Sequence, residues 1–455
     1  MRRRVDAGKL PGFASCVIHK GAVVHVAEHG FADMETRTPF TIDTIVRIYC
    51  MTKTAVAVGI LILMERGLLQ LTDPVSKYIP RFASLYVVKH GNATSEVAAR
   101  SPNVAKKFTI LRLLTHTAGV GYGASFGFKA SGGHERMYEP LLTAVDSGKF
   151  STLEDFCNEL GELPLRYKPA KDLNYSMGHD VLGRIIEVVS GQTLDVFFQK
   201  ELFKPLAMND TSFCVPVRKA SRLAALYGDR VRAERMTEFS GKHSELLHRR
   251  KTAFCRIDGN TPGDSNWIKG SHCKVFSGNG VLGNNTGGLV STLSDQARFH
   301  TMLLNGGVLG SHRILQASTV ERWCFQDLLP LPGVRGKRKR TGIEWSGWTA
   351  LGQRGMKRMK RDPKPSSDDY EEGEVGMGGA ATTIWSINPV RDQVTLFFAQ
   401  TLDGDTWRPD HSTSAGMKAS SENFVVAARA AAGRDAAAAA GRRKSLSFGA
   451  PPGSC

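Results

Sequence analysis

The sequence lacks any apolar run long enough to cross a membrane as a helix. The apolar segment AVAVGILILM (residues 55–64) falls short of the roughly 18 residues that a transmembrane helix needs, so it predicts a buried helix. The first residues, MRRRVDAGKLPG, also lack the apolar core of a secretory signal peptide. We therefore expect neither a transmembrane segment nor a secretory signal.

Closely spaced cysteine pairs are also missing. The eight cysteines are scattered, and no two of them form a C-x-x-C pair. Without a secretory signal, this favours free thiols in a reducing compartment, so we expect a cytoplasmic protein unless an N-terminal targeting segment has been lost. Cys255, His272 and Cys273 match no structural zinc spacing. We expect no metal, and nothing in the sequence demands an organic cofactor.

Acidic residues are outnumbered by basic ones, 43 to 60, which gives a formal net charge of +17. Such an excess attracts nucleic acid and anionic surfaces in general. Much of it is local, however, because two basic segments (333–340 and 354–361) are followed by an acidic one (366–374). Opposite charge blocks beside Pro, Ser and Gly indicate an exposed charged insertion over residues 333–374. Nucleic-acid binding by the basic residues 333–361 is the third and least favoured interpretation, and we expect no nucleic-acid partner.

Strand-forming segments lie near both ends of the chain. One hairpin is predicted over residues 13–33 with its turn at Lys20-Gly21, and another over 382–401 with its turn at Asn388-Pro389. Helices are predicted between them, over 50–68, 108–120, 151–165 (N-cap Ser151), 176–208 (two helices, separated at Ser190-Gly191) and 286–307 (N-cap Ser294).

This order of elements predicts an α+β fold whose sheet is assembled from distant parts of the chain. Residues 1–75 and 285–430 are expected to form a sheet-and-helix region, and residues 76–284 a mostly helical region. Residues 431–455 are a low-complexity tail.

Cys50 stands three residues before Lys53, where the buried helix is expected to begin. A helix start and a neighbouring ammonium both favour the thiolate form of a cysteine, because each stabilises its negative charge. This spacing alone is weak evidence, since a buried cysteine is more often a small apolar core residue.

The segment RIYCMTK (residues 47–53) resembles the Ser-x-x-Lys motif of the serine β-lactamase, DD-peptidase and esterase superfamily, and is closest to its class C and esterase branch. The resemblance covers residues 12–402 and continues in order through LTDPVSKYIPRF, FTILRLLTHTAGV, LNYSMGHDVLGRIIEVVSGQ, LFKPLAMNDTSF, TGGLVSTLSDQARFHTMLLNGGVLG and GEVGMGGAATTIWSINP. It implies an antiparallel sheet flanked by helices, an all-helical region, and an active site in the cleft between them.

The resemblance also implies roles for individual residues. Cys50 occupies the nucleophile position, where the family has serine. Lys53 matches the lysine that assists proton removal. Tyr175 matches the tyrosine of the second motif, which shares the general-base and proton-shuttle duty. His116, His179 and Asp180 are interpreted as structural residues at helix ends and in a helix.

The third motif of the family corresponds to Met377, Gly378, Gly379 and Ala380. The oxyanion hole would be formed by the backbone N–H groups of Cys50 and Ala380. The two glycines would keep the strand open for substrate. Because Met377 offers no charge to hold a carboxylate, a neutral ester or amide is the expected substrate.

Two functions remain open. The first is a β-lactamase-related, esterase-like hydrolase that transfers an acyl group from a small ester through a Cys50 acyl-enzyme. The alternative is a catalytically impaired member that binds a ligand or partner in the cleft. It arises because sulfur is larger than oxygen, and a misalignment of several tenths of an ångström can cost about 100-fold in rate. The sequence gives no indication of oligomeric state. A further departure is that only about ten residues precede the first predicted strand, where the family usually has a helix.

Overall fold

The computed structural model of the protein describes residues 1–8, 10–88, 100–121, 137–146, 149–228, 255–256, 288–329, 346–355 and 371–402. Most of the predicted insertion 333–374 and all of the tail 431–455 lie outside these residues, as do His272 and Cys273. The predicted boundaries between the sheet-and-helix region and the helical region stay a prediction.

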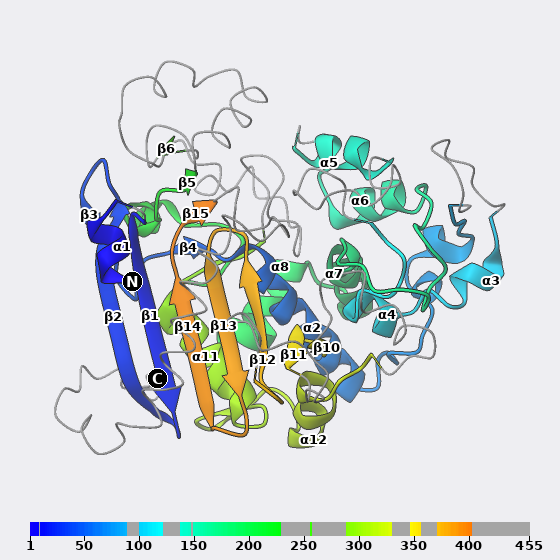
Figure 1. Ribbon diagram of the computed structural model, residues 1–455. Coiled ribbons are helices and arrows are strands. Elements are labelled where there is room, and N and C mark those ends of the chain that lie inside the picture. The colour runs from blue at the N-terminus through cyan, green and yellow to red at the C-terminus, as the bar shows by residue number, and fades with distance from the viewer. Residues whose placement is uncertain are drawn as a thin grey trace, which may run out of the picture.

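An eight-stranded antiparallel sheet forms one part of the molecule (Figure 1). Its order is β10-β11-β12-β13-β14-β1-β2-β3, so the N-terminal strand β1 pairs with β14 from the far end of the described chain. The strands are β1 (Gly12–His19), β2 (Ala22–Asp33), β3 (Thr38–Pro39), β10 (Ser346–Trp348), β11 (Gln353–Gly355), β12 (Val375–Gly379), β13 (Thr383–Asn388) and β14 (Gln393–Phe398).

Both predicted hairpins are confirmed. β1 and β2 join through Lys20 and Gly21, which both have positive φ (+50° and +71°), as a tight hairpin turn requires. β13 and β14 join directly after Asn388, whose side chain accepts a hydrogen bond from the Arg391 N–H at 3.0 Å. The fully buried pattern of β14 shows that this strand is covered on both faces.

The remaining strands form three small sheets. β4 (Val46–Arg47) pairs with β7 (Val290–Ser291) just ahead of Cys50. The other strands are β5 (Tyr227–Gly228), β6 (Cys255–Arg256), β15 (Thr401–Leu402), β8 (Val308–Leu309) and β9 (His312–Arg313).

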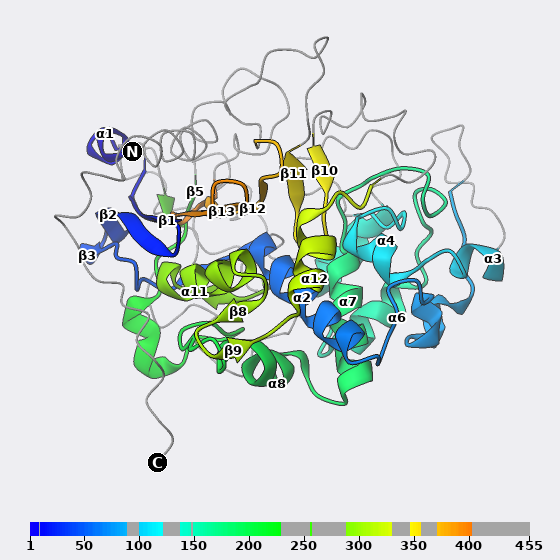
Figure 2. The ribbon, with the colours of Figure 1, turned by 90° about the horizontal axis from the view of Figure 1, so that it is seen from below.

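Helix α11 packs on β1, β13 and β14, and α2, α8 and α12 lie on the same side of the sheet, whereas α3, α4, α5, α6 and α7 lie beyond its β10 edge and α1 lies at the N-terminus (Figures 1 and 2). The helices are α1 (Arg2–Asp6), α2 (Thr52–Glu65), α3 (Pro102–Ala105), α4 (Ile110–Leu114), α5 (Glu139–Asp146), α6 (Leu153–Leu160), α7 (Gly178–Ser190), α8 (Leu194–Phe198), α11 (Leu293–Leu304) and α12 (Ala317–Thr319). Short 3-10 turns cover Tyr49–Met51, Val75–Lys77, Pro80–Ala83 and Val217–Arg222, and π-helical turns extend α8 (Gln199–Phe203) and α12 (Val320–Phe325).

Two predicted N-caps are wrong by one or two residues. Thr152, not Ser151, caps α6, and its hydroxyl accepts from the Asp155 N–H in a capping box. Thr292, not Ser294, caps α11, and its hydroxyl accepts from the Asp295 N–H at 3.1 Å. In both places neighbouring hydroxyl residues compete for the cap, and the helix start decides which one is used.

Helix α2 is the centre of the molecule. It is apolar on all sides, and its residues from Thr52 to Leu63 are buried. A helix of this kind needs partners all round. Its main helical partner is α7, which also packs against α4, α6 and α8. Because α2 begins directly after the Cys50 turn, the core fixes the position of that turn.

Four of the described cysteines are free and buried: Cys16, Cys50, Cys157 and Cys324. Burial raises the pKa of the Cys157 and Cys324 thiols, so these two act as apolar core residues. Cys214 is disulfide-bonded. The expectation of free thiols throughout is therefore wrong at Cys214, and the cytoplasmic location that rests on it loses support.

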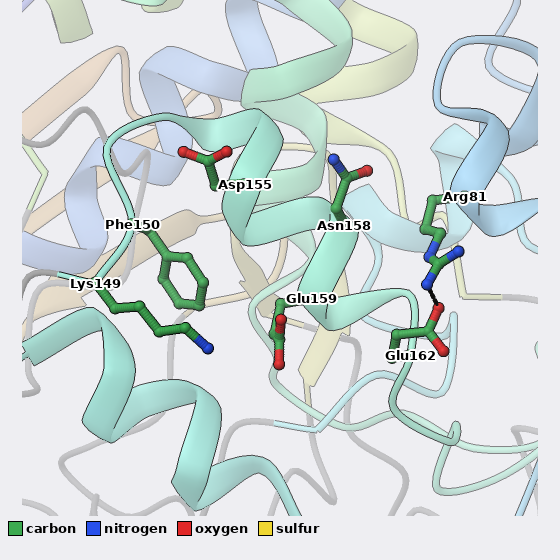
Figure 3. Close-up of a pocket in the computed structure, with 7 residues that line it drawn as sticks. All are labelled: Arg81, Lys149, Phe150, Asp155, Asn158, Glu159 and Glu162. Carbon is green, nitrogen blue, oxygen red and sulfur yellow. Dashed lines mark ion pairs between the residues drawn. The ribbon is translucent and has the colours of Figure 1, made fainter.

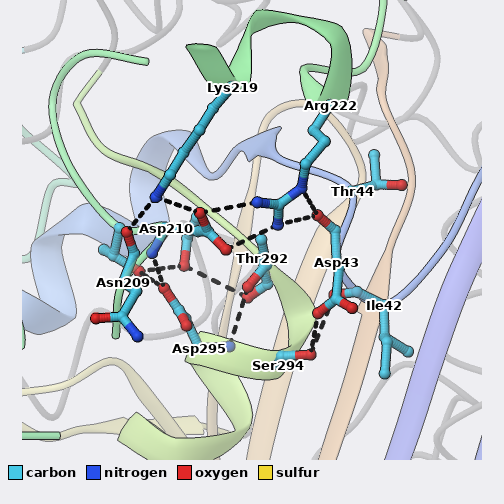
Figure 4. A network of polar contacts seen from close by, with 12 residues as sticks. Ile42, Asp43, Thr44, Asn209, Asp210, Lys219, Arg222, Thr292, Ser294 and Asp295 are labelled. Atoms are coloured by element: carbon cyan, nitrogen blue, oxygen red, sulfur yellow. Dashed lines mark hydrogen bonds and ion pairs between the residues drawn. The ribbon is translucent and has the colours of Figure 1, made fainter. Parts of the chain in front are cut away.

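A polar network ties the chain that leads into β4 to the start of α11 (Figure 4). The Arg222 guanidinium donates to both carboxylate oxygens of Asp210, at 3.0 and 2.7 Å, and to the Asp43 carbonyl at 2.7 Å. The Asp295 carboxylate accepts from the Asp210 N–H and the Thr211 hydroxyl, both at 2.8 Å. This network holds the approach to the Cys50 turn.

Candidate active site

Cys50 lies in the 3-10 turn Tyr49–Met51, between β4 and the first residue of α2. The turn closes through the Met51 N–H, which donates to the Ile48 carbonyl at 3.1 Å. Tyr49 has φ of +46°, a conformation that is costly for a bulky residue and marks local strain. Cys50 is only 2% exposed.

Lys53 and Tyr175 lie next to each other. Lys53 is in the first turn of α2 and fully buried, whereas Tyr175 is partly buried in the irregular chain that precedes α7. The Lys53 ammonium lies over the Tyr175 ring, with Nζ 4.9 Å from the ring centroid. This cation–π contact keeps the two side chains next to each other in a buried setting.

The third motif also lies beside the Cys50 turn. Met377, Gly378 and Gly379 form the end of β12, and Ala380 begins the turn to β13. A Cβ added at Gly379 would lie 2.3 Å from the Ile48 carbonyl oxygen, so only glycine allows this approach. The end of β12 therefore lies against the chain that leads into the Cys50 turn.

A group of rings surrounds Tyr175. The His116 ring lies 4.6 Å from the Tyr175 ring, 5.0 Å from the His179 ring and 5.0 Å from the Trp348 ring, measured between centroids. Trp348 also lies edge-on to Tyr175 at 6.4 Å. Its Nε1–H donates to the Leu114 carbonyl at 3.2 Å, which ties β10 to the end of α4.

The two histidines of this group are held neutral. Burial lowers the pKa of His116 well below its usual value, and the nearby Lys53 charge lowers it further. Burial is also the main cause that lowers the pKa of His179, with smaller effects from His116 and Lys53. A neutral imidazole beside a cation avoids a buried like-charge pair.

The contacts of His116 and Trp348 with Tyr175 are the part of the site that the sequence does not reveal. His116 lies at a helix end, as expected, because it follows Thr115, the C-cap of α4, and its Nδ1 accepts a hydrogen bond from the Ser176 N–H. His179 and Asp180 are in the first turn of α7, as expected. Ring contacts between segments far apart in the chain leave no local pattern to detect.

A pocket of about 580 Å³ lies along α6, away from these residues (Figure 3). Its lining carries both signs of charge, and Arg81 is ion-paired with Glu162. Because it contains neither Cys50, Lys53 nor Tyr175, we assign it no catalytic role. Among the described residues no group of His, Cys, Asp and Glu could hold a metal, and no described helix is long and apolar enough to span a membrane.

The family model described as Beta-lactamase matches residues 1–415. The chain belongs to the beta-lactamase family. Protein Rv1367c of Mycobacterium tuberculosis is 26% identical to it over 408 residues, which cover 88% of each chain. Esterase EstB of Burkholderia gladioli is 31% identical over 205 residues, 45% of this chain and 47% of that protein. Lovastatin esterase of Penicillium rubens is 26% identical over 225 residues, 48% of this chain and 52% of that protein.

Solved structures share the fold. Simvastatin synthase from Aspergillus terreus superposes with a TM-score of 0.67 at 18% identity, over 94% of this chain and 96% of its own. EstCE1, a hydrolase with promiscuous acyltransferase activity, superposes with a TM-score of 0.63 at 19% identity, over 93% and 95%. The predicted fold class is confirmed.

Proposed function

We propose that the protein is an esterase-like hydrolase that transfers the acyl group of a small neutral ester through a thioester on Cys50. The observation that carries this proposal is that three segments, separate in the sequence, lie close together in the fold. The Cys50 turn, the Lys53–Tyr175 pair and the end of β12 lie next to one another, in the chain order of the family motifs. Esterases among the family relatives support the choice of an ester.

The proposed reaction has two steps. In the first, the Cys50 sulfur attacks the ester carbonyl carbon, and the C–O bond to the leaving group breaks. The Lys53 ammonium passes a proton through the Tyr175 hydroxyl to the departing alkoxide and takes up the thiol proton in its place. In the second, water attacks the thioester carbon, the C–S bond breaks, and the same two groups carry the proton that the water loses to the sulfur. Alcohol and carboxylic acid are the products.

The negative charge that develops on the carbonyl oxygen needs fixed donors. The backbone N–H groups of Cys50 and Ala380 are the proposed pair, because Gly379 lets the end of β12 approach the Ile48 carbonyl closely. No particular side chain is needed at either position. The cysteine thus leaves this part of the mechanism unaltered.

Met377 supports a neutral substrate. It is 7% exposed, next to the two glycines of β12, and it places an uncharged, apolar thioether there. A carboxylate in the substrate would find no charge at this position. Short-chain neutral esters are therefore the proposed substrates.

A specific observation favours a second candidate, a non-catalytic member that binds a ligand or partner in the cleft. Cys50 is 2% exposed and lies in the main apolar core cluster, as an ordinary structural cysteine would. A nucleophile must be reached by its substrate, so this burial counts against turnover. The two candidates differ in whether Cys50 becomes acylated.

The test compares wild type, Cys50→Ser and Cys50→Ala on p-nitrophenyl acetate and butyrate, with intact protein mass recorded during turnover. The proposed esterase predicts turnover and an acyl adduct in wild type, and neither in Cys50→Ala. If only Cys50→Ser is active, the machinery has survived, the natural cysteine has silenced it, and the second candidate is favoured.

A further inference from the structure

His116 holds both chain neighbours of Tyr175. Its carbonyl oxygen accepts the Asn174 N–H at 2.9 Å, and its ring nitrogen Nδ1 accepts the Ser176 N–H at 3.1 Å. Between these two hydrogen bonds the His116 ring packs on the Tyr175 ring, with the centroids 4.6 Å apart. Residues 172–176 have no regular secondary structure, so such tertiary contacts must fix the tyrosine.

The hydrogen bond from Ser176 also fixes the tautomer of His116. A backbone N–H can only donate, so Nδ1 carries no proton and the proton of the neutral ring is on Nε2. The Ser176 hydroxyl, also 3.1 Å from Nδ1, then donates to the same nitrogen. Nε2 is buried without a hydrogen-bond partner among the described residues. The titratable groups whose contacts or charge place them against His116 are Lys53 of α2, His179 of α7 and Tyr175. Burial and the Lys53 charge both oppose a second proton on the ring.

The backbone of His116 is adapted to this arrangement. Its φ of +54° is left-handed, a conformation that histidine and asparagine adopt more readily than most residues. This conformation lies directly after α4, where the carbonyl and the ring of one residue reach the two neighbours of Tyr175. A strained backbone conformation of this kind persists only where contacts from the surrounding structure hold it.

We propose that His116 is the positioning residue for Tyr175. Its carbonyl accepts the N–H of residue 174, its neutral imidazole accepts the N–H of residue 176, and the imidazole packs on the tyrosine ring between them. The inference rests on the proposed acyl transfer, in which the Tyr175 hydroxyl relays a proton. A hydroxyl displaced by a fraction of an ångström relays that proton poorly.

Two variants separate the ring from the hydrogen bond. His116→Asn retains the left-handed backbone and a side-chain acceptor but removes the ring. His116→Phe retains a ring but removes the acceptor. We expect the acylation rate of Cys50 to fall by about 10- to 100-fold in each, with KM unchanged, because only the transition state depends on the placed hydroxyl.

A double-mutant cycle with Tyr175→Phe distinguishes positioning from general structural damage. Once the hydroxyl is gone, its placement no longer matters, so His116→Asn should cost less than about 2-fold in that background. An equal loss in both backgrounds, or no loss in wild type, would overturn the inference. The matched control is His300→Asn, which replaces a fully buried histidine of α11 whose Nδ1 bonds to the Gln296 carbonyl at 2.7 Å. It should lower stability and leave the acylation rate unchanged.

A second readout does not depend on activity. Ring 15N chemical shifts of His116 should report the Nε2–H tautomer and no titration between pH 5 and 8. A proton on Nδ1, or a titration in that range, would overturn the inference. If neither wild type nor Cys50→Ser is acylated, the proposed function fails. The 15N result still decides whether His116 accepts the Ser176 N–H as a neutral ring.

Discussion

The polar network of Figure 4, called the Asp295 network below, pairs acidic and basic side chains with one another. It joins the chain before β4 to the 3-10 turn Val217–Arg222 and to α11. Around Tyr175, by contrast, rings pack on one another and the Lys53 ammonium lies over a ring face. The His116 Nε2 in this second group has no hydrogen-bond partner among the described residues. No buried side-chain atom of Asp210, Arg222 or Asp295 is left in that state, as far as the structure describes them.

The backbone differs in the same way. Tyr49, His116 and Thr382 have positive φ. Tyr49 directly precedes Cys50, the His116 ring packs on Tyr175, and Thr382 follows Ala380 by two residues. Among the described residues of the Asp295 network none has this conformation. Strain and an unpartnered polar atom lower stability, and they persist where function requires them. We infer that the network supplies stability, whereas the region around Tyr175 gives up stability for the proposed acyl transfer.

The largest effect is expected at Tyr175. Tyr175→Phe should lower kcat/KM for p-nitrophenyl butyrate by about 1,000-fold, because it removes the hydroxyl that relays the proton. The ring over Lys53 remains, so the melting temperature should change little. Tyr138→Phe is the matched control, since it removes a buried hydroxyl that donates to the Pro164 carbonyl at 2.6 Å. That control should lower stability by about 1 kcal/mol without loss of activity, and equal activity losses in both variants would contradict the proposed role of Tyr175.

The next effect concerns the contact between β12 and the Cys50 turn. Gly379→Ala places a Cβ 2.3 Å from both the Ile48 carbonyl oxygen and Thr383 Oγ1, so the strand must move away. The acylation rate should fall by about 100-fold. At Gly378, the nearest atom to an added Cβ is the Thr383 carbonyl oxygen at 3.3 Å, so Gly378→Ala should have a much smaller effect. Stopped-flow release of p-nitrophenol measures both. Equal losses would show that the Ile48 contact is not what matters.

The Asp295 network should respond to pH in stability and not in activity. Burial raises the pKa of Asp295 to about 6, above the 3.8 of an exposed aspartate. The folded state therefore binds more protons than the unfolded state between these values. The stability that Asp295 contributes is full below about pH 4 and is lost as the pH rises through 6.

Asp295→Asn tests this, because the amide oxygen can still accept from the Asp210 N–H and the Thr211 hydroxyl without a charge. The difference in unfolding free energy between wild type and the variant should change by about 2–3 kcal/mol from pH 4 to pH 7, to the disadvantage of wild type. Urea unfolding at several pH values provides the measurement. Parallel curves for the two proteins would rule out the raised pKa.

The smallest effect is expected at the start of α11. Thr292→Ala removes the N-cap hydroxyl and should cost about 1 kcal/mol of unfolding free energy, with kcat/KM unchanged. Ser294→Ala removes only a hydroxyl that donates to the Asp43 carboxylate at 2.8 Å near the surface, so it should cost less. A larger loss for Ser294→Ala in thermal unfolding would contradict the assignment of the cap.

Much of the fold could be predicted because its signals are local. Lys20-Gly21 and Asn388-Pro389 mark hairpin turns by their own chemistry, and the apolar segment 55–64 is a helix that must be buried on all sides. Capping could be predicted only to within one or two residues, because hydroxyl residues cluster at both helix starts.

The candidate site could be predicted only where a motif carries it. The order of the short motif segments along the chain is enough to identify four candidate residues: Cys50, Lys53, Tyr175 and Gly379. The hydrogen bonds that His116 accepts from residues 174 and 176 could not be predicted in this way. They depend on a left-handed backbone and on ring contacts between segments that the fold brings together. The disulfide at Cys214 is likewise a tertiary property that cysteine spacing does not contain.

The most direct test of the account is the intact mass of wild type and of Cys50→Ala during incubation with p-nitrophenyl acetate, followed by peptide mapping. We predict an acetyl adduct on the peptide that contains Cys50 in wild type, which decays as the thioester is hydrolysed, and no adduct on this peptide in Cys50→Ala. A wild type that releases no p-nitrophenol and carries no adduct, or an adduct that persists unchanged in Cys50→Ala, would contradict the role of Cys50 as the nucleophile.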